Sequence, residues 1–258
     1  FMSRTIDSLF TVKSASATPL HIIQKWDEIE LTELQKNMLG TKISQNLTKN
    51  QFFTLPNGRG NIALAAVGFN NEEPFFTLGE AYKKLPEGRY KLTGDFANET
   101  LFQHLFAFGL GAYQFDKYKK SPKKEIQFVV SEQLFKGLKH ALHAHYLVRD
   151  LSNEPPNVMA PDNLATAIRA EFRNYDARFN VEISEIVGSD LLKQNFPLIY
   201  TVGAGSKYNP RLIEITAGNP EHPALTLVGK GVTFDTGGLD IKPSSGMRLM
   251  KKDMGGAA

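Results

Sequence analysis

Apolar and polar residues recur along the chain with two different periods, which predict where helices and strands lie. The clearest helical pattern covers residues 131–151, where apolar side chains return at three- and four-residue steps. A helix of that length spans about 30 Å, enough to join two domains. Residues 99–115 are apolar on several faces and predict a buried helix. Its Gly109 and Gly111 weaken the helix, so we expect another element to pack closely there.

Short apolar runs bounded by turn residues predict the strands. In the first half, strands are expected at 20–26, 51–55, 61–68 and 125–130, with helices at 27–36 and 81–85. From residue 161 onward, helices at 162–172 and 189–195 alternate with strands at 181–187, 198–202, 212–217 and 225–228. Apolar strands alternating with helices are typical of a mixed, mostly parallel sheet covered on both faces.

The predicted class is therefore α/β, with two domains. We assign residues 1–124 to an N-terminal α/β domain, and residues 125–160 to a strand, the long linker helix and a Pro-rich connection. Residues 161–258 form the first part of a C-terminal α/β domain. A length of 258 residues agrees with one or two cores.

Composition narrows the chemistry. The net charge of +3 comes without a long basic block, so nucleic acid is not an expected partner. The chain has no cysteine, so a bound metal must use oxygen or nitrogen ligands. No apolar run approaches the roughly 18 residues of a membrane-spanning helix, and the first twenty residues lack a signal-peptide pattern. We expect a cytoplasmic protein without a membrane partner.

Three weaker patterns favour ordinary explanations. The basic stretch 117–124 (KYKKSPKK) is interpreted as a solvated loop, and His140, His143 and His145 as solvated or packed side chains. The Gly-rich stretch at 203–206 lacks the third glycine of GxGxxG, and residues 228–232 do not match GxxxxGK[ST]. A nucleotide-binding module is therefore the least favoured hypothesis.

The candidate catalytic and metal-binding residues lie in the last thirty-odd residues. After the predicted strand at 225–228, a Gly-rich loop carries Lys230, Asp235, Lys242 and Asp253. The Gly pair after Asp235 permits a sharp turn, and the Gly pair at 255–256 permits close backbone approach. Carboxylates are hard ligands for divalent cations, and an ammonium can stabilise an oxyanion. The spacing indicates a metal-dependent hydrolase, while a surface loop with two exposed salt bridges remains an alternative.

The residues around these charges resemble the signature of the leucyl (cytosol) aminopeptidase family. Residues 230–243 read KGVTFDTGGLDIKP and residues 247–258 read MRLMKKDMGGAA. Further family-like stretches are LSNEPPNVM at 151–159, VGAGS at 202–206, PRLI at 210–213 and, more loosely, GAYQFDKY at 111–118. The clear resemblance covers residues 150–258, with a fainter continuation back to about residue 100.

The resemblance implies a role for each charged residue. Lys230, Asp235 and Asp253 would be ligands of a two-metal centre, with Asp235 bridging the ions. Zinc or manganese is typical, with magnesium as an alternative. Lys242 would be the catalytic ammonium, and Met250 would line the pocket for the substrate's first side chain. Family members remove N-terminal residues, often leucine, from peptides and assemble as homo-hexamers.

This sequence departs from the family pattern at its end. The family completes its site with an Asn-Thr-Asp-Ala-Glu-Gly-Arg segment, which supplies another Asp, a Glu and an Arg beside a bicarbonate. The 258 residues contain no such segment. We therefore expect a part of a larger protein, active as an aminopeptidase only with the missing C-terminal part. The alternative is a non-catalytic fragment that acts as an assembly or binding module.

Overall fold

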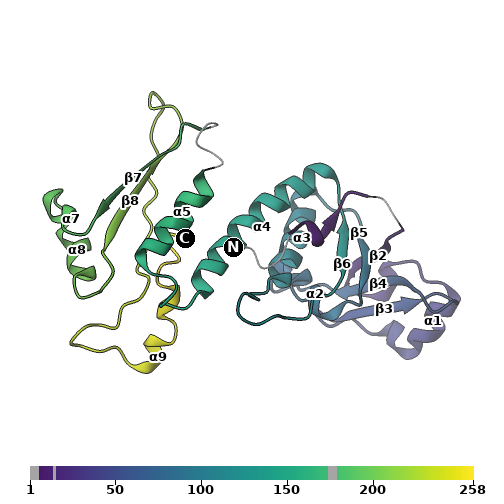
Figure 1. Ribbon diagram of the computed structural model, residues 1–258. Coiled ribbons are helices and arrows are strands. Elements are labelled where there is room, and N and C mark those ends of the chain that lie inside the picture. Colours follow the sequence, from purple (N-terminus) through teal and green to yellow (C-terminus); the bar gives the residue numbers. More distant parts are fainter. Residues whose placement is uncertain (1–5, 14–15, 174–178) are drawn as a thin grey trace. The chain divides into compact units, whose positions relative to one another are not determined.

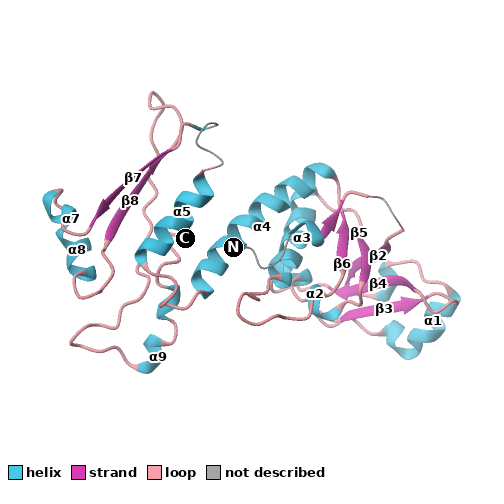
Figure 2. Cartoon of the chain, in the orientation of Figure 1, coloured by secondary structure: helices cyan, strands magenta, loops and turns pink. Residues whose placement is uncertain are grey.

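The computed structural model describes residues 6–13, 16–173 and 179–258, and it divides into two compact units. The first unit comprises Phe1–Tyr146 and the second Leu147–Ala258, so the boundary falls within helix α4 (Glu132–Asn153). Helices and strands occur in both units (Figures 1 and 2). The predicted α/β class is confirmed, and so is the long helix expected at 131–151.

A six-stranded sheet forms the centre of the first unit, in the order β1-β6-β5-β2-β4-β3. Its strands are β1 (Phe10–Thr11), β2 (Thr18–Ile23), β3 (Phe52–Pro56), β4 (Ile62–Gly68), β5 (Gly88–Thr93) and β6 (Ile126–Val129). All neighbouring pairs are parallel except β3 and β4, which are antiparallel. The sheet is thus mostly parallel, and the carboxyl ends of all its strands except β3 lie on the same side of the sheet.

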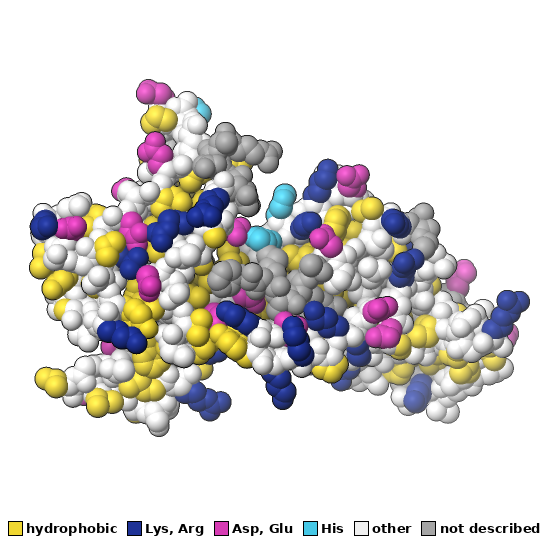
Figure 3. Space-filling model, viewed as in Figure 1, with side chains coloured by type: hydrophobic (Ala, Val, Ile, Leu, Met, Phe, Trp, Pro, Cys, Tyr) yellow, Lys and Arg dark blue, Asp and Glu magenta, His cyan; other side chains and the backbone are white. Residues whose placement is uncertain are grey.

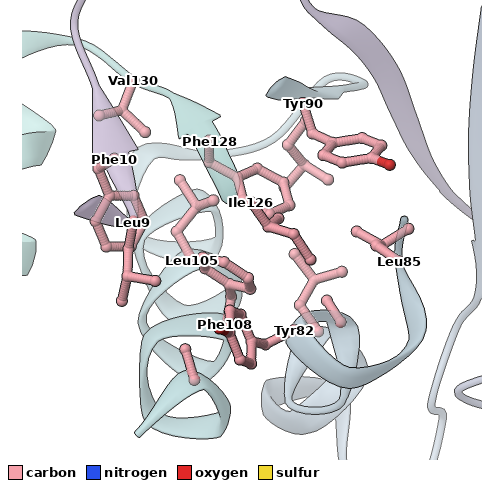
Figure 4. Close-up of a cluster of buried hydrophobic side chains, with 14 of the residues drawn as sticks. Leu9, Phe10, Tyr82, Leu85, Tyr90, Leu105, Phe108, Ile126, Phe128 and Val130 are labelled. Atoms are coloured by element: carbon pink, nitrogen blue, oxygen red, sulfur yellow. The ribbon is translucent and has the colours of Figure 1, made fainter. Parts of the chain in front are cut away.

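Apolar residues cover both faces of this sheet. One face packs against α2 (Ala81–Lys84), α3 (Asn98–Ala112) and the first part of α4, and Phe128 of β6 contacts Phe108 of α3 there (Figure 4). The other face packs against Trp26, which precedes α1 (Glu33–Leu39), and against Leu39 at the end of α1. The described part of this unit also has 3-10 turns at Ile6–Ser8, Trp26–Glu28, Gly40–Ser44 and Pro74–Leu78.

The glycines of α3 have the predicted role. A Cβ on Gly109 would lie 2.4 Å from Leu142 Cδ1 of α4, and one on Gly111 would lie 1.7 Å from the Gly79 carbonyl oxygen. Both distances are shorter than real Cβ atoms show. At Gly111 the obstacle is backbone, so close packing there requires glycine, whereas at Gly109 the Leu142 side chain would have to shift. The expectation of close packing is confirmed.

The helix expected at 27–36 is displaced. The structure has a 3-10 turn at Trp26–Glu28, and α1 begins only at Glu33. Thr32 caps α1: its Oγ1 accepts a hydrogen bond from the Gln35 backbone at 3.3 Å, and Gln35 Oε1 accepts one from the Thr32 backbone at 2.9 Å. This reciprocal capping box, a Thr followed three residues later by Gln, sets the start of the helix.

The second unit contains α5 (Pro161–Phe172), β7 (Glu182–Val187), α7 (Asp190–Lys193), α8 (Pro197–Gly203), β8 (Arg211–Thr216), α9 (Ser244–Met247) and a 3-10 turn at Met250–Lys252. Strands β7 and β8 form an antiparallel pair. Glu185 of β7 accepts hydrogen bonds from Arg169 at 2.6 Å and Arg211 at 2.5 Å, which joins α5 to both strands.

Two predicted strands of the second unit are wrong. Residues 198–202 lie in helix α8, because Pro197 at its first position is pre-organised for a helix start. Residues 225–228 form no regular element, and Leu225, Leu227 and Val228 are 86%, 87% and 94% exposed. Among the described residues this segment pairs with no strand, so its backbone has no ladder to join. Apolar side chains of the second unit are visible at the surface (Figure 3).

The helices of the described residues do not meet the requirements of a bilayer. None of the helices there combines the length and the apolar character that a bilayer-spanning segment needs.

Candidate active site

A glycine turn shapes the loop that carries Asp235. Gly237 and Gly238 have φ values of +91° and +69°, which glycine adopts without strain. A Cβ on Gly237 would lie 2.1 Å from the Asp240 carbonyl oxygen. The turn is closed by a 2.9 Å hydrogen bond from the Lys242 backbone to the Thr236 carbonyl. It therefore brings Lys242 back beside Asp235, seven residues earlier in the chain.

Asp235 is held by partners on both carboxylate oxygens. Its Oδ1 accepts a 2.8 Å hydrogen bond from the Gly237 backbone, and its Oδ2 forms an ion pair with Lys242. Lys242 Nζ also donates to the Asp235 backbone carbonyl at 3.3 Å. The hydrogen bond from Lys242, then that from Gly237, and the charges of Lys242 and Lys230 lower the pKa of Asp235. Asp235 is thus an ionised carboxylate at neutral pH.

Lys230 pairs with a carboxylate much later in the chain. Its Nζ lies 2.7 Å from Asp253 Oδ2, across 23 residues of sequence, and its charge also lowers the pKa of Asp235. The side chains of Asp253 and Asp235 are 33% and 42% exposed, so neither is fully solvated. The structure therefore gathers the four predicted charges into two ion pairs, Lys230 with Asp253 and Lys242 with Asp235.

Backbone contact sets the distance between Lys230 and Asp253. A Cβ on Gly229 would lie 2.2 Å from the Gly256 carbonyl oxygen, and one on Gly256 would lie 3.0 Å from the Lys230 nitrogen. The close approach expected at the Gly pair 255–256 is confirmed. Two segments that lie far apart in sequence thus run in direct backbone contact beside the charges.

Met254 anchors the segment that carries Asp253. It is fully buried against Leu151, Met159 and Leu164. Lys251 supports the same segment, since its Nζ lies 3.1 Å from Asn153 Oδ1 at the end of α4. Sequence reasoning missed this anchor, although Met254 is an apolar residue between a charged stretch and a glycine pair.

Met250 lies at the start of the last 3-10 turn and is half-buried. Its carbonyl accepts the hydrogen bond from the Asp253 backbone at 3.0 Å. No group of three or more His, Cys, Asp or Glu side chains suited to a metal occurs in the described ranges. The described donors at this site are therefore two carboxylates and the lysine amines.

The fold places this protein among α/β proteins, and comparison with known proteins specifies the family. Residues 146–258 match the catalytic domain of the cytosol aminopeptidase family, and residues 36–131 match the M17 aminopeptidase N-terminal domain. The chain belongs to the M17, or cytosol aminopeptidase, family, whose members are peptidases.

Individual relatives agree over nearly the whole chain. The crystal structure of the cytosol aminopeptidase from Coxiella burnetii is 32% identical with a TM-score of 0.87, over 97% of this chain and 55% of that one. A probable cytosol aminopeptidase from Rickettsia rickettsii is 35% identical, over 96% of this chain and 46% of its own length. The bottromycin maturation enzyme BotP, in complex with Mn, is 25% identical with a TM-score of 0.73, over 94% and 54%. The chain thus spans about half the length of these relatives.

Proposed function

We propose that this chain supplies one part of a two-metal aminopeptidase centre, which removes leucine-like N-terminal residues from peptides. Lys230, Asp235 and Asp253 are its metal ligands, Lys242 is its catalytic ammonium, and Met250 lines the pocket for the first side chain. The observation that carries this proposal is that the four charges are paired with one another, Lys230 with Asp253 and Lys242 with Asp235.

The donor set fits part of a divalent-metal site. Two carboxylates offer the hard oxygen ligands that divalent cations prefer, and a lysine amine becomes a ligand once it loses its proton. The ionised state of Asp235 favours a cation beside it. Zinc, manganese or magnesium would satisfy this chemistry, and a relative in complex with Mn supports manganese.

Each residue has a distinct task in peptide hydrolysis. Bound divalent ions supply an activated water and polarise the scissile carbonyl. Lys242 is oriented by the carboxylate and the backbone carbonyl of Asp235, so its remaining proton can face the substrate oxygen on which charge develops. Asp253 keeps its position through Met254 and the Gly229–Gly256 contact. These contacts orient the groups before substrate arrives, which lowers the cost of reaching the transition state.

Hydrolysis in this proposal requires groups that the 258 residues do not supply. The family resemblance assigns the other ligands, and a bicarbonate, to the Asn-Thr-Asp-Ala-Glu-Gly-Arg segment. We propose that the chain binds divalent metal alone and hydrolyses peptides only when joined to that part. The homo-hexamer is proposed from the same resemblance. A cytoplasmic location is proposed from the relatives' name, cytosol aminopeptidase.

A chimera tests the proposal. The chain is fused to the remaining part of the Coxiella burnetii relative, and hydrolysis of leucine p-nitroanilide is measured with Mn²⁺. We expect turnover, which Lys242→Met reduces by about 10²–10³-fold in kcat without weakening Mn²⁺ binding, because one oxyanion donor is lost. Calorimetric titration of the chain itself should show saturable Mn²⁺ binding that Asp253→Asn weakens.

Lys193 and Asp190 provide the matched controls. They form an exposed ion pair, with 2.6 Å between Lys193 Nζ and Asp190 Oδ1, and they lie in α7, outside the charged loop. Lys193→Met and Asp190→Asn should leave both turnover and Mn²⁺ affinity unchanged. Equal Mn²⁺ affinity of Asp253→Asn and Asp190→Asn would exclude the charged loop as a metal site.

A non-catalytic assembly module is the second candidate function. It is favoured by the absence, within the described residues, of a His, Cys, Asp or Glu group large enough to hold a metal. An inactive chimera, together with a chain that forms hexamers by light scattering and binds no Mn²⁺, would support this function instead.

A further inference from the structure

The first unit contains a cavity of about 260 Å³ that has no role in the proposed hydrolysis. Its walls are formed by Ile22, Ile23, Gln24, Glu28, Phe69, Phe96, Thr100 and His104. Gln24 directly follows β2, Phe69 directly follows β4, and Phe96 lies three residues after β5. These three strands are adjacent and parallel. The cavity therefore lies at the carboxyl ends of parallel strands.

This position is the one that favours ligand binding in open α/β sheets. After β2 the chain proceeds to β3 and β4 on one side, whereas after β5 it proceeds through α3 to β6 on the other side. Helix α1 packs on one face of the sheet and α3 on the opposite face. The neighbouring strands β2 and β5 thus form a topological switch point, where a crevice opens beyond the strand ends.

His104 is the most unusual residue of the cavity wall. It is 3% exposed, and its Nδ1 has no hydrogen-bond partner within the described ranges. The ring of Phe96 contacts it edge-on, with centroids 5.8 Å apart. Burial lowers the pKa of His104, so the imidazole is neutral near pH 7 and offers one nitrogen as an acceptor. Buried polar groups are nearly always satisfied, so a missing partner here indicates a ligand.

The polar groups around the cavity are rich in acceptors. Glu28 Oε1 accepts hydrogen bonds from the backbones of Gln24 at 3.1 Å and Lys25 at 2.8 Å, which fixes the carboxylate. Both of these bonds are made to Oε1, which leaves Oε2 for a further donor. Gln24 Nε2 donates a hydrogen bond to Asn71 Oδ1 at 3.1 Å, which leaves the side-chain carbonyl oxygen of Gln24 available as an acceptor. Thr100 contributes a hydroxyl.

The charge around the cavity has one predominant sign. Among the described residues that line the wall, Glu28 is the only one with a charged side chain. The two segments that supply most of the wall, 24–28 and 95–104, carry four carboxylates and one lysine. Such an excess raises the local concentration of cations. Phe69 and Phe96 add aromatic rings, whose faces also attract cations.

From this cavity we infer a binding site for a small organic cation, a primary ammonium on a short apolar chain. An ammonium has three donors and no acceptor, which complements Glu28, Thr100 and His104. The apolar chain of the ligand would contact Ile22 and Phe96. This site is in the first unit, and its inference does not depend on the peptidase activity.

The test uses the whole ¹⁵N-labelled chain and three ligands of equal length: n-butylamine, sodium butyrate and n-butanol. At pH 7.5, n-butylamine should produce saturable NMR chemical-shift changes of the His104 imidazole and the Thr100 amide. Butyrate and butanol should bind at least tenfold more weakly. Equal binding of butyrate, or shifts that do not saturate, would overturn the inference.

Variants separate the carboxylate from its structural role. Glu28→Gln keeps an oxygen for the two backbone hydrogen bonds but removes the charge, and should lower the affinity for n-butylamine at least tenfold. Thr100→Val keeps the shape of the side chain and should lower this affinity at least threefold. Glu33→Gln is the matched control, since Glu33 is 81% exposed on α1 outside the cavity wall, and should leave the affinity unchanged. Unaltered binding to Glu28→Gln would also overturn the inference.

Discussion

The two units of this molecule hold their residues in place by different means. The first unit packs a buried apolar cluster on each face of its six-stranded sheet, and the larger cluster includes the fully buried Phe108, Phe128 and Leu20. In the second unit a small buried cluster around Met254 supports the charged loop, and the segment that leads to this loop is exposed. The charged groups are therefore positioned by turns and backbone contacts and less by burial.

Truncation of one large side chain in each unit should show the largest difference. Phe108→Ala should lower the free energy of unfolding by about 3–5 kcal/mol, because it leaves a cavity in a close-packed core. Leu227→Ala should change it by less than about 0.5 kcal/mol, because Leu227 is 87% exposed. Urea unfolding followed by far-UV circular dichroism measures both. A cost above about 1 kcal/mol for Leu227→Ala would show that the segment is covered in solution.

Periodicity predicted most of the elements in both units. The helix at 131–151 was predictable because its apolar repeat is long, and the strands at 61–68 and 181–187 because Gly or charged residues bound them. Residues 198–202 were predicted wrongly because a five-residue apolar run has no distinguishable period. There Pro197, directly before this run, favours the start of a helix.

The segment 225–228 shows what a local pattern cannot reveal. Its residues have strand propensity, but a strand also needs a neighbour for its backbone hydrogen bonds, and this neighbour is set by distant sequence. For the same reason, four charged candidates were recognisable in the sequence, but which of them form pairs was not. The pairing of Lys230 with Asp253 depends on the approach of Gly229 to Gly256, which sequence spacing does not encode.

A glycine substitution tests whether backbone contact positions the charges. In Gly229→Ala, the new Cβ would meet the Gly256 carbonyl oxygen at 2.2 Å, so the two segments must separate. We expect a loss of about 1–3 kcal/mol in the free energy of unfolding. In the proposed metal site, Mn²⁺ affinity should fall at least tenfold, because Lys230 moves away from Asp253.

Gly205→Ala is the matched control. Gly205 lies in the same unit, and a Cβ there would have no atom within 4 Å. Stability should change by less than about 0.5 kcal/mol, and calorimetric Mn²⁺ titration should give the affinity of the unmodified chain. Equal Mn²⁺ affinities of the two variants would mean that the contact between Gly229 and Gly256 does not position the proposed ligands.

The smallest effect is a dependence of the first unit's stability on pH. Burial lowers the pKa of His104 below its ordinary value of 6.5, so the folded state binds fewer protons than the unfolded state under mildly acidic conditions. The contribution of the neutral imidazole is thus fully present above pH 6.5 and is lost as the pH falls toward the folded pKa. His21 of β2, whose pKa burial also lowers, adds a change of the same sign.

Urea unfolding monitored by Trp26 fluorescence between pH 7.5 and 5.5 measures this dependence, because the chain's one tryptophan lies in the first unit. Stability of the unmodified chain should decline through this range. His104→Gln, which cannot take up the proton, should make the decline shallower, whatever its effect on stability at pH 7.5. His222→Gln, which alters an exposed side chain of the second unit, should retain the original slope. An identical slope for His104→Gln and the unmodified chain would show that His104 is hydrated in solution, contrary to its burial beside Phe96.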